Sequence, residues 1–339
     1  MSSKAPITTG YRTSARITAV GSYLPKRVLS NDDLEKMVDT NDEWIVQRTG
    51  IRERRIAADD EYTSGLCFHA VRDLIERYPE KSLEDVDYIL VATATPDTFF
   101  PQTAARVQAE FGIKAAGAAD VAAACAGFVS ALQLAGGLIA SGLHRKILVI
   151  GAETLSRITD YTDRTTCILF GDGAGAVLVE AGASDSKPSW LHSFARTDGE
   201  DGHHLYRSSL SPSIGEHSLQ QSGKIVQNGR AVFRWAISRV PESILEMLNE
   251  AGTAPEDVDW FVPHNPNMRI LDVVSEKTGI PLDKTITTLE HTGNTSAASI
   301  PLALSEGVRS GRIREGQLLL LYGFGGGLSQ SGLLIRWMA

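Results

Sequence analysis

The chain has 339 residues, 42% hydrophobic and 22% charged, which is typical of a soluble globular protein with two domains or two halves. Its 33 basic and 41 acidic side chains give a net charge of −8, so nucleic acid is not expected as a partner. The three cysteines, Cys67, Cys125 and Cys167, are widely separated and odd in number, which argues against a disulfide framework and for a reducing compartment. We therefore expect a cytoplasmic protein, and its start shows no secretory signal.

The first predicted strand covers residues 15–20, and Ser30 or Asn31 marks the start of the helix that follows. Trp44 and Arg48 lie four residues apart and therefore share one face of a helix. Such a pair either sandwiches a nucleobase or forms a surface cation–π contact, and both interpretations stay open at this point.

A helix over residues 63–78 and an apolar strand over residues 88–94 come next. The loop behind this strand carries two adjacent phenylalanines, Phe99 and Phe100. Paired phenylalanines rarely stay in water, so we expect them either to cap the core or to fill a cavity of a partner.

Residues 120–143 form the longest run without Asp, Glu, Lys or Arg after its first position, and Cys125 lies near its start. A segment that is apolar on all sides belongs in the interior, and the Gly, Ser and Gln residues in this run argue against a membrane span. We interpret residues 120–123 as the end of a buried strand and Cys125 as the start of a buried helix. The free N–H groups and the dipole of that helix predict a lowered thiol pKa and a nucleophile. The alternative is an inert, buried cysteine.

A second buried strand is predicted over residues 146–151, followed by a polar connection. The glycines Gly171, Gly173 and Gly175 enter a strand rather than a helix, so they indicate close backbone packing and not a phosphate site. Residues 181–224 are rich in Ser, Gly, Asp and His and are interpreted as an insertion or hinge. They include the solvent-facing pair His203 and His204, for which no third metal ligand is evident, and we expect no metal site.

The second half of the chain repeats the first. The motif EDVD occurs at residues 84–87 and 256–259, each time before an apolar strand, and ILVIG resembles LLLLYG. The Ser-Gly pair that closes one buried helix, at 141–142, recurs at 310–311, and the same offset counted back from Asn294 reaches Cys125. Cys125 and Asn294 are therefore predicted to start equivalent central helices. The expected architecture is α/β, with two stacked βαβ-rich halves, residues 1–182 and 183–339, related by a pseudo-twofold axis.

Three polar residues, Cys125, His264 and Asn294, are expected to converge, because ligands gather at strand carboxyl ends and helix starts. A cysteine with a histidine permits a hydrolase. A neutral histidine and an amide side chain, however, are two donors that can hold one carbonyl oxygen as it becomes an enolate. This set favours carbon–carbon bond formation on an acyl thioester, with a carbanion made by loss of carbon dioxide.

These residues resemble the β-ketoacyl-acyl carrier protein synthase III enzymes of type II fatty acid synthesis. The resemblance covers essentially the whole chain, including DTNDEWIVQRTGIRERR, DVAAACAGF, TDRTTCILFGDGAGA, GNTSAASIP and YGFGGG. It implies the thiolase fold with αβαβα layers and a homodimer. It also implies an acyl-CoA primer that acylates Cys125, and malonyl-acyl carrier protein that loses carbon dioxide beside His264 and Asn294. No cofactor is implied, because the CoA thioester is a substrate.

The resemblance also assigns roles to residues outside the catalytic set. Backbone N–H groups of Cys125 and Gly326 would form the oxyanion hole, and Phe100 would enter the acyl pocket of the partner subunit. The other residues would bind the substrates, with Arg269 and Arg234 as docking points for the acidic carrier protein and Trp44, Arg48, Arg164 and Asn267 around CoA. One departure is Asn-Pro-Asn after His264, where the family usually has Gln-Ala-Asn, so that Pro266 removes a backbone donor.

Alternative functions differ in the acceptor of the acyl group. Pro266 is the only sequence support for an acyltransferase or starter-unit enzyme of a specialised pathway. A Cys-His hydrolase and a non-catalytic scaffold are less favoured. The sequence does not determine the preferred primer, because acetyl, branched and medium-chain groups differ by methylenes worth only ~1 kcal/mol each.

Overall fold

Two mixed β-sheets form the framework of the protein, a computed structural model that describes residues 13–183 and 186–338. The first sheet has the strand order β1-β7-β6-β4-β5. Its strands are β1 (Ala15–Tyr23), β7 (Asp172–Ala181), β6 (Lys146–Thr154), β4 (Tyr88–Ala92) and β5 (Gly117–Val121). β4 is parallel to both β5 and β6, whereas β7 is antiparallel to both β6 and β1.

The second sheet repeats this arrangement with one strand fewer. Its order is β13-β14-β15-β8, from β13 (Trp260–Pro263), β14 (Leu318–Gly325), β15 (Ser329–Arg336) and β8 (Trp190–Thr197). β13 and β14 are parallel, and the pairs β14-β15 and β15-β8 are antiparallel. Taken in order, β13, β14, β15 and β8 therefore run in the same relative directions as β4, β6, β7 and β1. A counterpart of β5 survives as a single parallel bridge between Phe261 and Thr285. The predicted internal repeat is confirmed by this topology.

An aspartate side chain accepts equivalent backbone hydrogen bonds in each half of the repeat. Asp87 accepts from the backbone N–H groups of Arg145 and Lys146 at 2.7 and 3.3 Å, and Asp259 accepts from the N–H of Leu318 at 2.7 Å. Each aspartate also donates its own N–H across the sheet, to the carbonyls of Lys146 and Leu318. The last aspartates of the two EDVD motifs therefore fix the start of parallel strands at equivalent places in the two halves.

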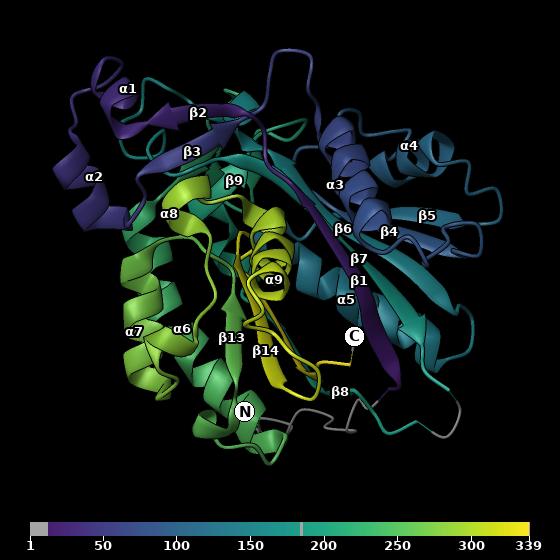
Figure 1. Ribbon diagram of the computed structural model, residues 1–339. Helices are drawn as coiled ribbons and strands as arrows, with labels where there is room; N and C mark the ends of the chain where they lie inside the picture. Colours follow the sequence, from purple (N-terminus) through teal and green to yellow (C-terminus); the bar gives the residue numbers. More distant parts are fainter. Residues whose placement is uncertain (1–12, 184–185, 339) are drawn as a thin grey trace.

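Helices form three layers around the two sheets (Figure 1). α3 (Thr63–Arg77) and α4 (Thr103–Glu110) cover the first sheet on the outside, and α6 (Gly229–Glu250) packs on the second sheet with α7 (Met268–Thr278) beside it. Between the sheets lie α5 (Gly127–Ala140) and α9 (Ser299–Arg309), and both contact strands of the two sheets. The predicted αβαβα layering of the thiolase fold is confirmed.

Burial explains the sequence of the central layer. All nine residues of β6 are buried, as expected of a strand covered on both faces. The two sheets cover most of α5, although Leu134 is 51% exposed, and one core cluster joins α5 and α9 to both sheets. Within residues 13–183 and 186–338, no helix is long and apolar enough to cross a membrane.

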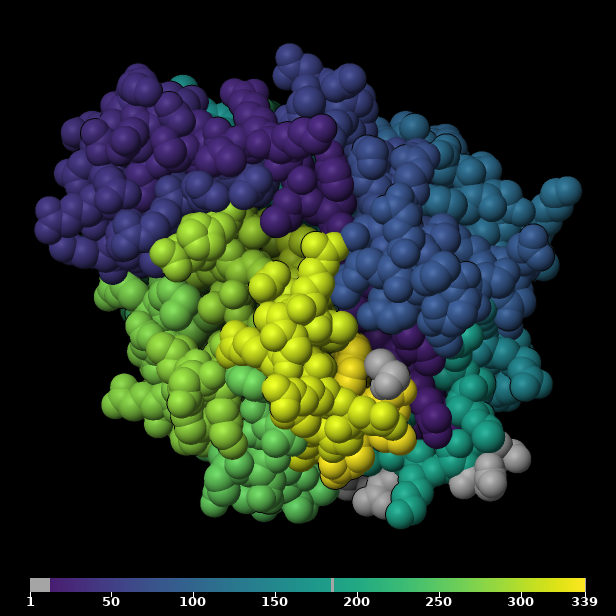
Figure 2. Space-filling view, in the orientation of Figure 1, coloured from purple at the N-terminus to yellow at the C-terminus, as the bar shows by residue number. Residues whose placement is uncertain are grey.

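A small cap lies over one end of the sheets. It consists of α1 (Asn31–Glu35), α2 (Asp42–Thr49), β2 (Arg27–Ser30), β3 (Glu53–Ile56) and α8 (Leu289–Thr292). Ser30 caps α1 with a reciprocal bond to Asp33, which confirms the predicted helix start. Fully buried Arg54 ties the cap to the first half through Asn31 and the carbonyl of Ile168. Figure 2 shows this cap, in purple, against the green and yellow C-terminal half.

Two sequence-based interpretations are wrong in detail. Residues 181–224 are not simply an insertion or hinge, because they supply β8 to the second sheet. The rest of this stretch is short structure, with β9 (Leu205–Arg207), β10 (Ser213–Ile214), β11 (His217–Ser218) and, just beyond it, β12 (Ile225–Gln227). β5 is half-buried at the sheet edge rather than buried. The boundary between the two halves, placed between residues 182 and 183, stays a prediction. β7 ends one residue before this boundary, at Ala181.

Candidate active site

Cys125 lies where the first half passes from its edge strand into its central helix. The chain leaves β5 and forms a short 3-10 helix, η1 (Ala124–Ala126), before α5 begins at Gly127. Ala124 has a φ of +43°, an uncommon conformation for a residue with a Cβ, and such strain clusters at functional sites. Cys125 is 8% exposed, so only a small part of the residue meets solvent.

The glycine run at the end of β14 allows the second half to approach this cysteine. A Cβ on Gly325 would lie 2.7 Å from Cys125 Cβ and 2.9 Å from its Sγ. A Cβ on Gly323 would lie 2.8 Å from the Cα of Ala126. The backbone N–H groups of Gly326 and of Cys125 itself lie near the sulfur, and both lower the pKa of the thiol. The two predicted oxyanion-hole donors therefore lie together at the thiol.

The predicted lowering of the thiol pKa is wrong for the unoccupied site. Burial raises the pKa of Cys125 to about 11, and the hydrogen bonds from Ser296, Gly326 and Cys125 itself offset this only in part. Desolvation penalises a thiolate more than one helix start can compensate, because the helix dipole contributes at most ~2 kcal/mol. Activation of the sulfur must therefore come from an acceptor for its proton.

His264 follows β13 at the carboxyl end of that strand, as predicted. The ring is 1% exposed, packs edge-on against Phe324 with centroids 5.5 Å apart, and places Nδ1 2.8 Å from the hydroxyl of Ser299. Burial lowers the pKa of His264 to about 3, so the imidazole is neutral near pH 7. Nε2 has no partner among the hydrogen bonds of the described residues and is left for a ligand.

Asn294 is held by its backbone in the loop that precedes the second central helix. It exchanges backbone hydrogen bonds with Leu169 and Gly171 of the first half, at 2.8 and 3.0 Å. A Cβ on Gly171 would lie 2.0 Å from the carbonyl of Thr292. The predicted role of this glycine in close packing, rather than in phosphate binding, is confirmed. The side-chain oxygen of Asn294 accepts from the N–H of Ser296 at 2.9 Å.

Ser296 joins the three predicted catalytic residues. Its side chain lowers the pKa of Cys125, its N–H binds Asn294, and its carbonyl accepts from the hydroxyl of Ser299, which contacts His264. It begins a second 3-10 helix, η6 (Ser296–Ala298), with a φ of +47° that matches Ala124 in the first half. Cys125, His264 and Asn294 therefore share one site around Ser296.

The predicted equivalence of Cys125 and Asn294 is wrong. β4, β6 and η1 match β13, β14 and η6 at the offset that separates the two EDVD motifs, and this offset places Ala297 opposite Cys125. Asn294 lies in the loop ahead of η6. The repeat therefore positions the asparagine beside the cysteine, but from a preceding turn.

Family models of 3-oxoacyl-[acyl-carrier-protein] synthase III match residues 119–199 and, for the C-terminal part, residues 248–337. A β-ketoacyl-[acyl-carrier-protein] synthase III 2 of Halalkalibacterium halodurans is 56% identical, over 95% of this chain and 96% of the relative. The corresponding protein of Bacillus subtilis is 55% identical, over 95% and 98%. The chain belongs to this family. It is an acyltransferase, a condensing enzyme that begins fatty acid synthesis.

Solved structures of the synthase III family agree with the fold. The enzyme from Thermus thermophilus superposes with a TM-score of 0.90 at 45% identity, covering 95% of this chain and 99% of that one. The priming β-ketosynthase of the R1128 polyketide pathway has a TM-score of 0.88 at 36% identity, covering 98% and 99%.

The predicted CoA-binding residues of this synthase III chain gather on α2 and the polar loop after β6. The guanidinium carbons of Arg164 and Arg48 lie 4.8 and 5.2 Å from the centroid of the Trp44 ring. Arg164 also forms an ion pair with Asp39 at 3.2 Å. The described chain therefore shows the cation–π contact, and a nucleobase between Trp44 and Arg164 requires the guanidinium to move.

Asn267 has a structural role that the sequence did not reveal. Its side chain caps α7 by accepting from the N–H of Arg269 at 2.9 Å, and it donates to the carbonyl of Arg48 at 3.0 Å. It thereby links α7 to α2. Pro266 directly precedes this cap, outside any helix or strand.

The two predicted docking arginines lie on neighbouring helices of the outer layer. Arg234 is exposed on α6, and Arg269 is exposed at the start of α7, where its guanidinium carbon lies 5.5 Å from the centroid of the Phe233 ring. Neither forms an ion pair with a carboxylate within residues 13–183 and 186–338. Both charges are thus available to an acidic partner.

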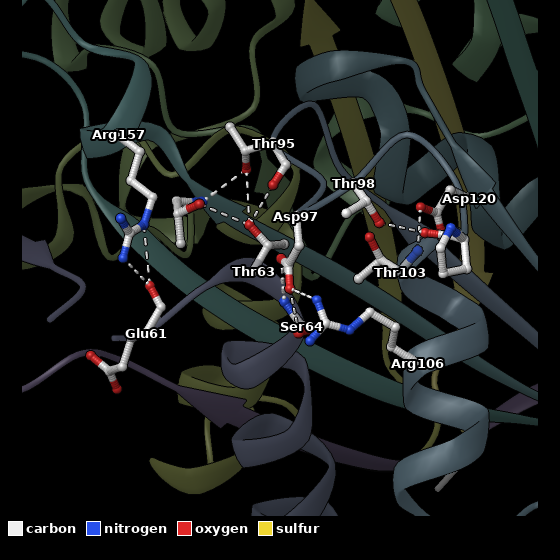
Figure 3. A network of polar contacts seen from close by, with 12 residues as sticks. Glu61, Thr63, Ser64, Thr95, Asp97, Thr98, Thr103, Arg106, Asp120 and Arg157 are labelled. Carbon is white, nitrogen blue, oxygen red and sulfur yellow. Dashed lines mark hydrogen bonds and ion pairs between the residues drawn. The ribbon is translucent and has the colours of Figure 1, made fainter. Parts of the chain in front are cut away.

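The loop that carries Phe100 is anchored on both sides, through Asp97 and Asp120 (Figure 3). Asp97 accepts from the hydroxyl of Ser64 at 2.6 Å and pairs with Arg106, and Asp120 binds the N–H groups at the start of α4 at 2.8 Å. Phe99 and Phe100 are 76% and 87% exposed, so they do not cap the core of their own chain. The remaining interpretation is that they fill a cavity of a partner.

The histidine pair His203 and His204 is half-buried rather than solvent-facing, and His217 stacks on His203 with centroids 3.6 Å apart. With Glu216 they line a cavity of about 540 Å³. In the part of the chain that the structure describes, no group of three or more His, Cys, Asp or Glu side chains is placed to hold a metal ion.

Proposed function

We propose that an acyl-CoA primer acylates Cys125, and that malonyl-acyl carrier protein then condenses with the acyl group to give a β-ketoacyl-carrier protein, CoA and carbon dioxide. The observation that carries this proposal is the link of Cys125, His264 and Asn294 through Ser296, with two backbone N–H groups at the sulfur. No cofactor takes part, since the CoA thioester is itself a substrate.

In the first half-reaction the N–H groups of Cys125 and Gly326 stabilise the oxyanion that forms when the sulfur attacks the primer thioester. Donors aimed at a developing negative charge contribute ~3 to 4 kcal/mol each. These two groups already point at the sulfur, and the glycine run excludes side chains from the same space. The attacking atom and its stabilising donors are therefore arranged in advance.

In the second half-reaction His264 and Asn294 hold the malonyl thioester oxygen while carbon dioxide leaves. A neutral imidazole is a suitable donor, and burial keeps His264 neutral by lowering its pKa to about 3. The single proton of the Ser299 hydroxyl has two acceptors within reach, the Ser296 carbonyl at 2.7 Å and His264 Nδ1 at 2.8 Å. The Ser299 hydroxyl donates to the Ser296 carbonyl in this structure, so Nε2 donates to the substrate only after that hydroxyl turns to Nδ1 and the ring proton lies on Nε2.

The substrates bind on two adjoining surfaces. Trp44 and Arg164 hold the adenine of CoA, with Arg48 beside them, and Asn267 contacts the pantetheine arm near its helix cap. Arg269 and Arg234 dock the acidic carrier protein, because both cations are exposed on adjacent helices without a carboxylate partner among the described residues.

The acting form is a homodimer in the cytoplasm. β5 is a sheet edge in this chain, with half-buried residues and with Phe99 and Phe100 exposed beside it, and such edges are normally covered. Phe100 enters the acyl pocket of the partner subunit and limits the length of the primer. The three cysteines are all free, as suits a reducing compartment.

A second candidate function is priming of a specialised pathway. It is favoured by the 36% identity to the priming β-ketosynthase of the R1128 polyketide pathway. The fatty acid function has the stronger support, because the two bacterial synthase III 2 relatives are 55% and 56% identical. Product analysis with malonyl-carrier protein against small nucleophiles separates the two.

Intact-protein mass spectrometry with acetyl-CoA tests the proposed function. The wild-type chain should gain one acetyl group, and Cys125→Ala should gain none. Cys167→Ala removes another buried, free cysteine and should acylate normally. His264→Ala and Asn294→Ala should still acylate but should no longer release carbon dioxide from malonyl-carrier protein. A wild-type chain that never gains an acyl group contradicts the proposal.

A further inference from the structure

Glu153 is a buried carboxyl that the reaction described so far does not use. It lies near the end of β6 and is 0% exposed. Both of its oxygens accept from the N–H of Ala94 at 3.1 Å, and one accepts from the hydroxyl of Thr95 at 2.6 Å. No lysine or arginine of the described residues pairs with it. A buried carboxyl without a counter-ion is costly, and such groups are kept mainly where they function.

Ser296 places this carboxyl one hydroxyl away from the nucleophile. η6 packs on β6 two residues before Glu153, where a Cβ on Gly151 would lie 2.3 Å from the carbonyl of Ala297. The Ser296 side chain lowers the pKa of both Cys125 and Glu153, so it lies close to the two groups. Its φ of +47° is unusual for a residue with a side chain, and its N–H and carbonyl are also bound, to Asn294 and Ser299. The strained backbone therefore fixes the hydroxyl between sulfur and carboxyl.

We propose that Glu153 and Ser296 form a proton relay that activates Cys125 for acylation. This inference rests on the proposed function, in which Cys125 attacks the primer. As the bond between Sγ and the acyl carbon forms, the thiol proton passes to Ser296 Oγ, and the hydroxyl proton of Ser296 passes to Glu153. When the bond between the acyl carbon and the CoA sulfur breaks, Ser296 Oγ gives a proton to the CoA sulfur and regains one from Glu153, so CoA leaves as a thiol and Glu153 is again a carboxylate. Glu153 acts through Ser296 and is a positioning residue.

The acid strengths of the buried groups agree with this route. Burial raises the pKa of Glu153 to about 7 and that of Cys125 to about 11, whereas it lowers the pKa of His264 to about 3. A proton from the thiol is therefore held much better by Glu153 than by His264. His264 is left to its role as a neutral donor in the second half-reaction.

The surroundings of Glu153 contain few other titratable groups. Cys125 on η1 and Cys67 on α3 are the thiols whose pKa its charge raises. Cys67 is fully buried, and burial raises its pKa well above the usual value, so it stays a thiol. A pH dependence of acylation near neutrality therefore reports on Glu153.

Rapid-quench mass spectrometry of Cys125 acetylation by acetyl-CoA, without malonyl-carrier protein, tests the relay from pH 5.5 to 9. The wild-type rate should rise with pH and level off near pH 7, as Glu153 ionises. In Glu153→Gln and Ser296→Ala the rate at pH 8 should fall about 100-fold, the usual scale of lost acid–base catalysis, and the levelling should disappear. Decarboxylation by enzyme that is already acylated should change little.

Asp172→Asn is the matched control, because Asp172 is a second buried carboxyl, on β7, bound to the N–H of Ala57 and to Ser156. It should acylate at the wild-type rate. Unchanged or faster acylation of Glu153→Gln overturns the relay, since removing a negative charge near the thiol would by itself ease its ionisation. A wild-type enzyme that does not acylate overturns the proposed function instead. Ser296→Ala provides the same test if Glu153→Gln does not fold.

Discussion

At the scale of single residues, desolvation decides the charge state of this site. Burial pushes Cys125, Glu153 and His264 toward their neutral forms, with pKa values of about 11, 7 and 3. Burial also makes the ionisation of the sulfur depend on a neighbouring proton acceptor.

The buried carboxyl should make the stability of the protein depend on pH. The pKa of Glu153 is about 7 in the folded chain against a usual value of 4.5, so the unfolded chain loses its proton first as pH rises. The contribution of Glu153 to the free energy of unfolding is complete below pH 4.5 and is lost as the pH rises through 7. The difference of about 2.5 pH units, at about 1.4 kcal/mol each, corresponds to about 3 kcal/mol.

Urea unfolding of Glu153→Gln at pH 5 and pH 8 measures this effect. The free energy of unfolding of the variant, relative to wild type, should rise by about 2 to 3 kcal/mol between the two pH values. A difference that is the same at both pH values contradicts the raised pKa.

At the scale of elements, two helices with asparagine caps carry the two predicted binding surfaces. Asn41 caps α2, with its side-chain oxygen 2.8 Å from the N–H of Trp44, and Asn228 caps α6 at 3.2 Å from the N–H of Ala231. α2 bears Trp44 and α6 bears Arg234. Each cap therefore fixes the first turn of a helix that holds a substrate residue.

Replacing each cap by alanine should weaken the binding of one substrate and leave the binding of the other unchanged. Asn41→Ala and Asn228→Ala should each lower stability by about 1 kcal/mol. Asn41→Ala should raise the KM for acetyl-CoA, and Asn228→Ala should raise the KM for malonyl-carrier protein. Steady-state kinetics with each substrate varied in turn provides the measurement. The same KM change for both substrates in both variants would mean that the caps act only on overall stability.

At the scale of the whole molecule, the two repeated halves bring equivalent 3-10 helices together at the site, but the residues on these helices differ. The two 3-10 helices, each beginning with a residue of positive φ, meet between the sheets. The first bears Cys125, and the equivalent position in the second is Ala297. One half thus supplies the proposed nucleophile, and the other supplies His264, Asn294 and Ser296.

A mixed dimer tests whether Phe100 serves its own chain or its partner. The Phe100→Ala homodimer should accept longer primers than wild type, because the pocket loses a bulky side chain. Coexpression of Phe100→Ala with Cys125→Ala, with a different tag on each chain, gives dimers in which the one active cysteine receives Phe100 from the other chain. These dimers should show the wild-type primer preference at about half the activity.

A broadened preference in the mixed dimers would mean that Phe100 acts within its own chain. Sedimentation analysis should show a species of twice the chain mass. A monomer that keeps full activity would contradict the homodimer.

Much of this protein was predictable from local sequence patterns. The apolar run after Asp120, the repeated EDVD motifs and the glycine run that contains Gly326 predict the central helix, the duplicated sheets and the close approach to Cys125. Such patterns work because periodicity and burial are local consequences of residue type. The family motifs added His264 and Asn294 as partners, and the structure brings them together around Ser296.

Tertiary structure alone decided the ionisation of the site and the residues that connect it. The sequence places Glu153 in a polar connection, because no pattern near it shows that β6 continues to Thr154 and is buried between two layers of helices. Ser296 was one of several small residues before a helix, and its positive φ follows from the packing of two halves that are distant in the sequence. The pKa of Cys125 rises rather than falls because desolvation depends on every atom that surrounds the sulfur, and those atoms come from both halves of the chain.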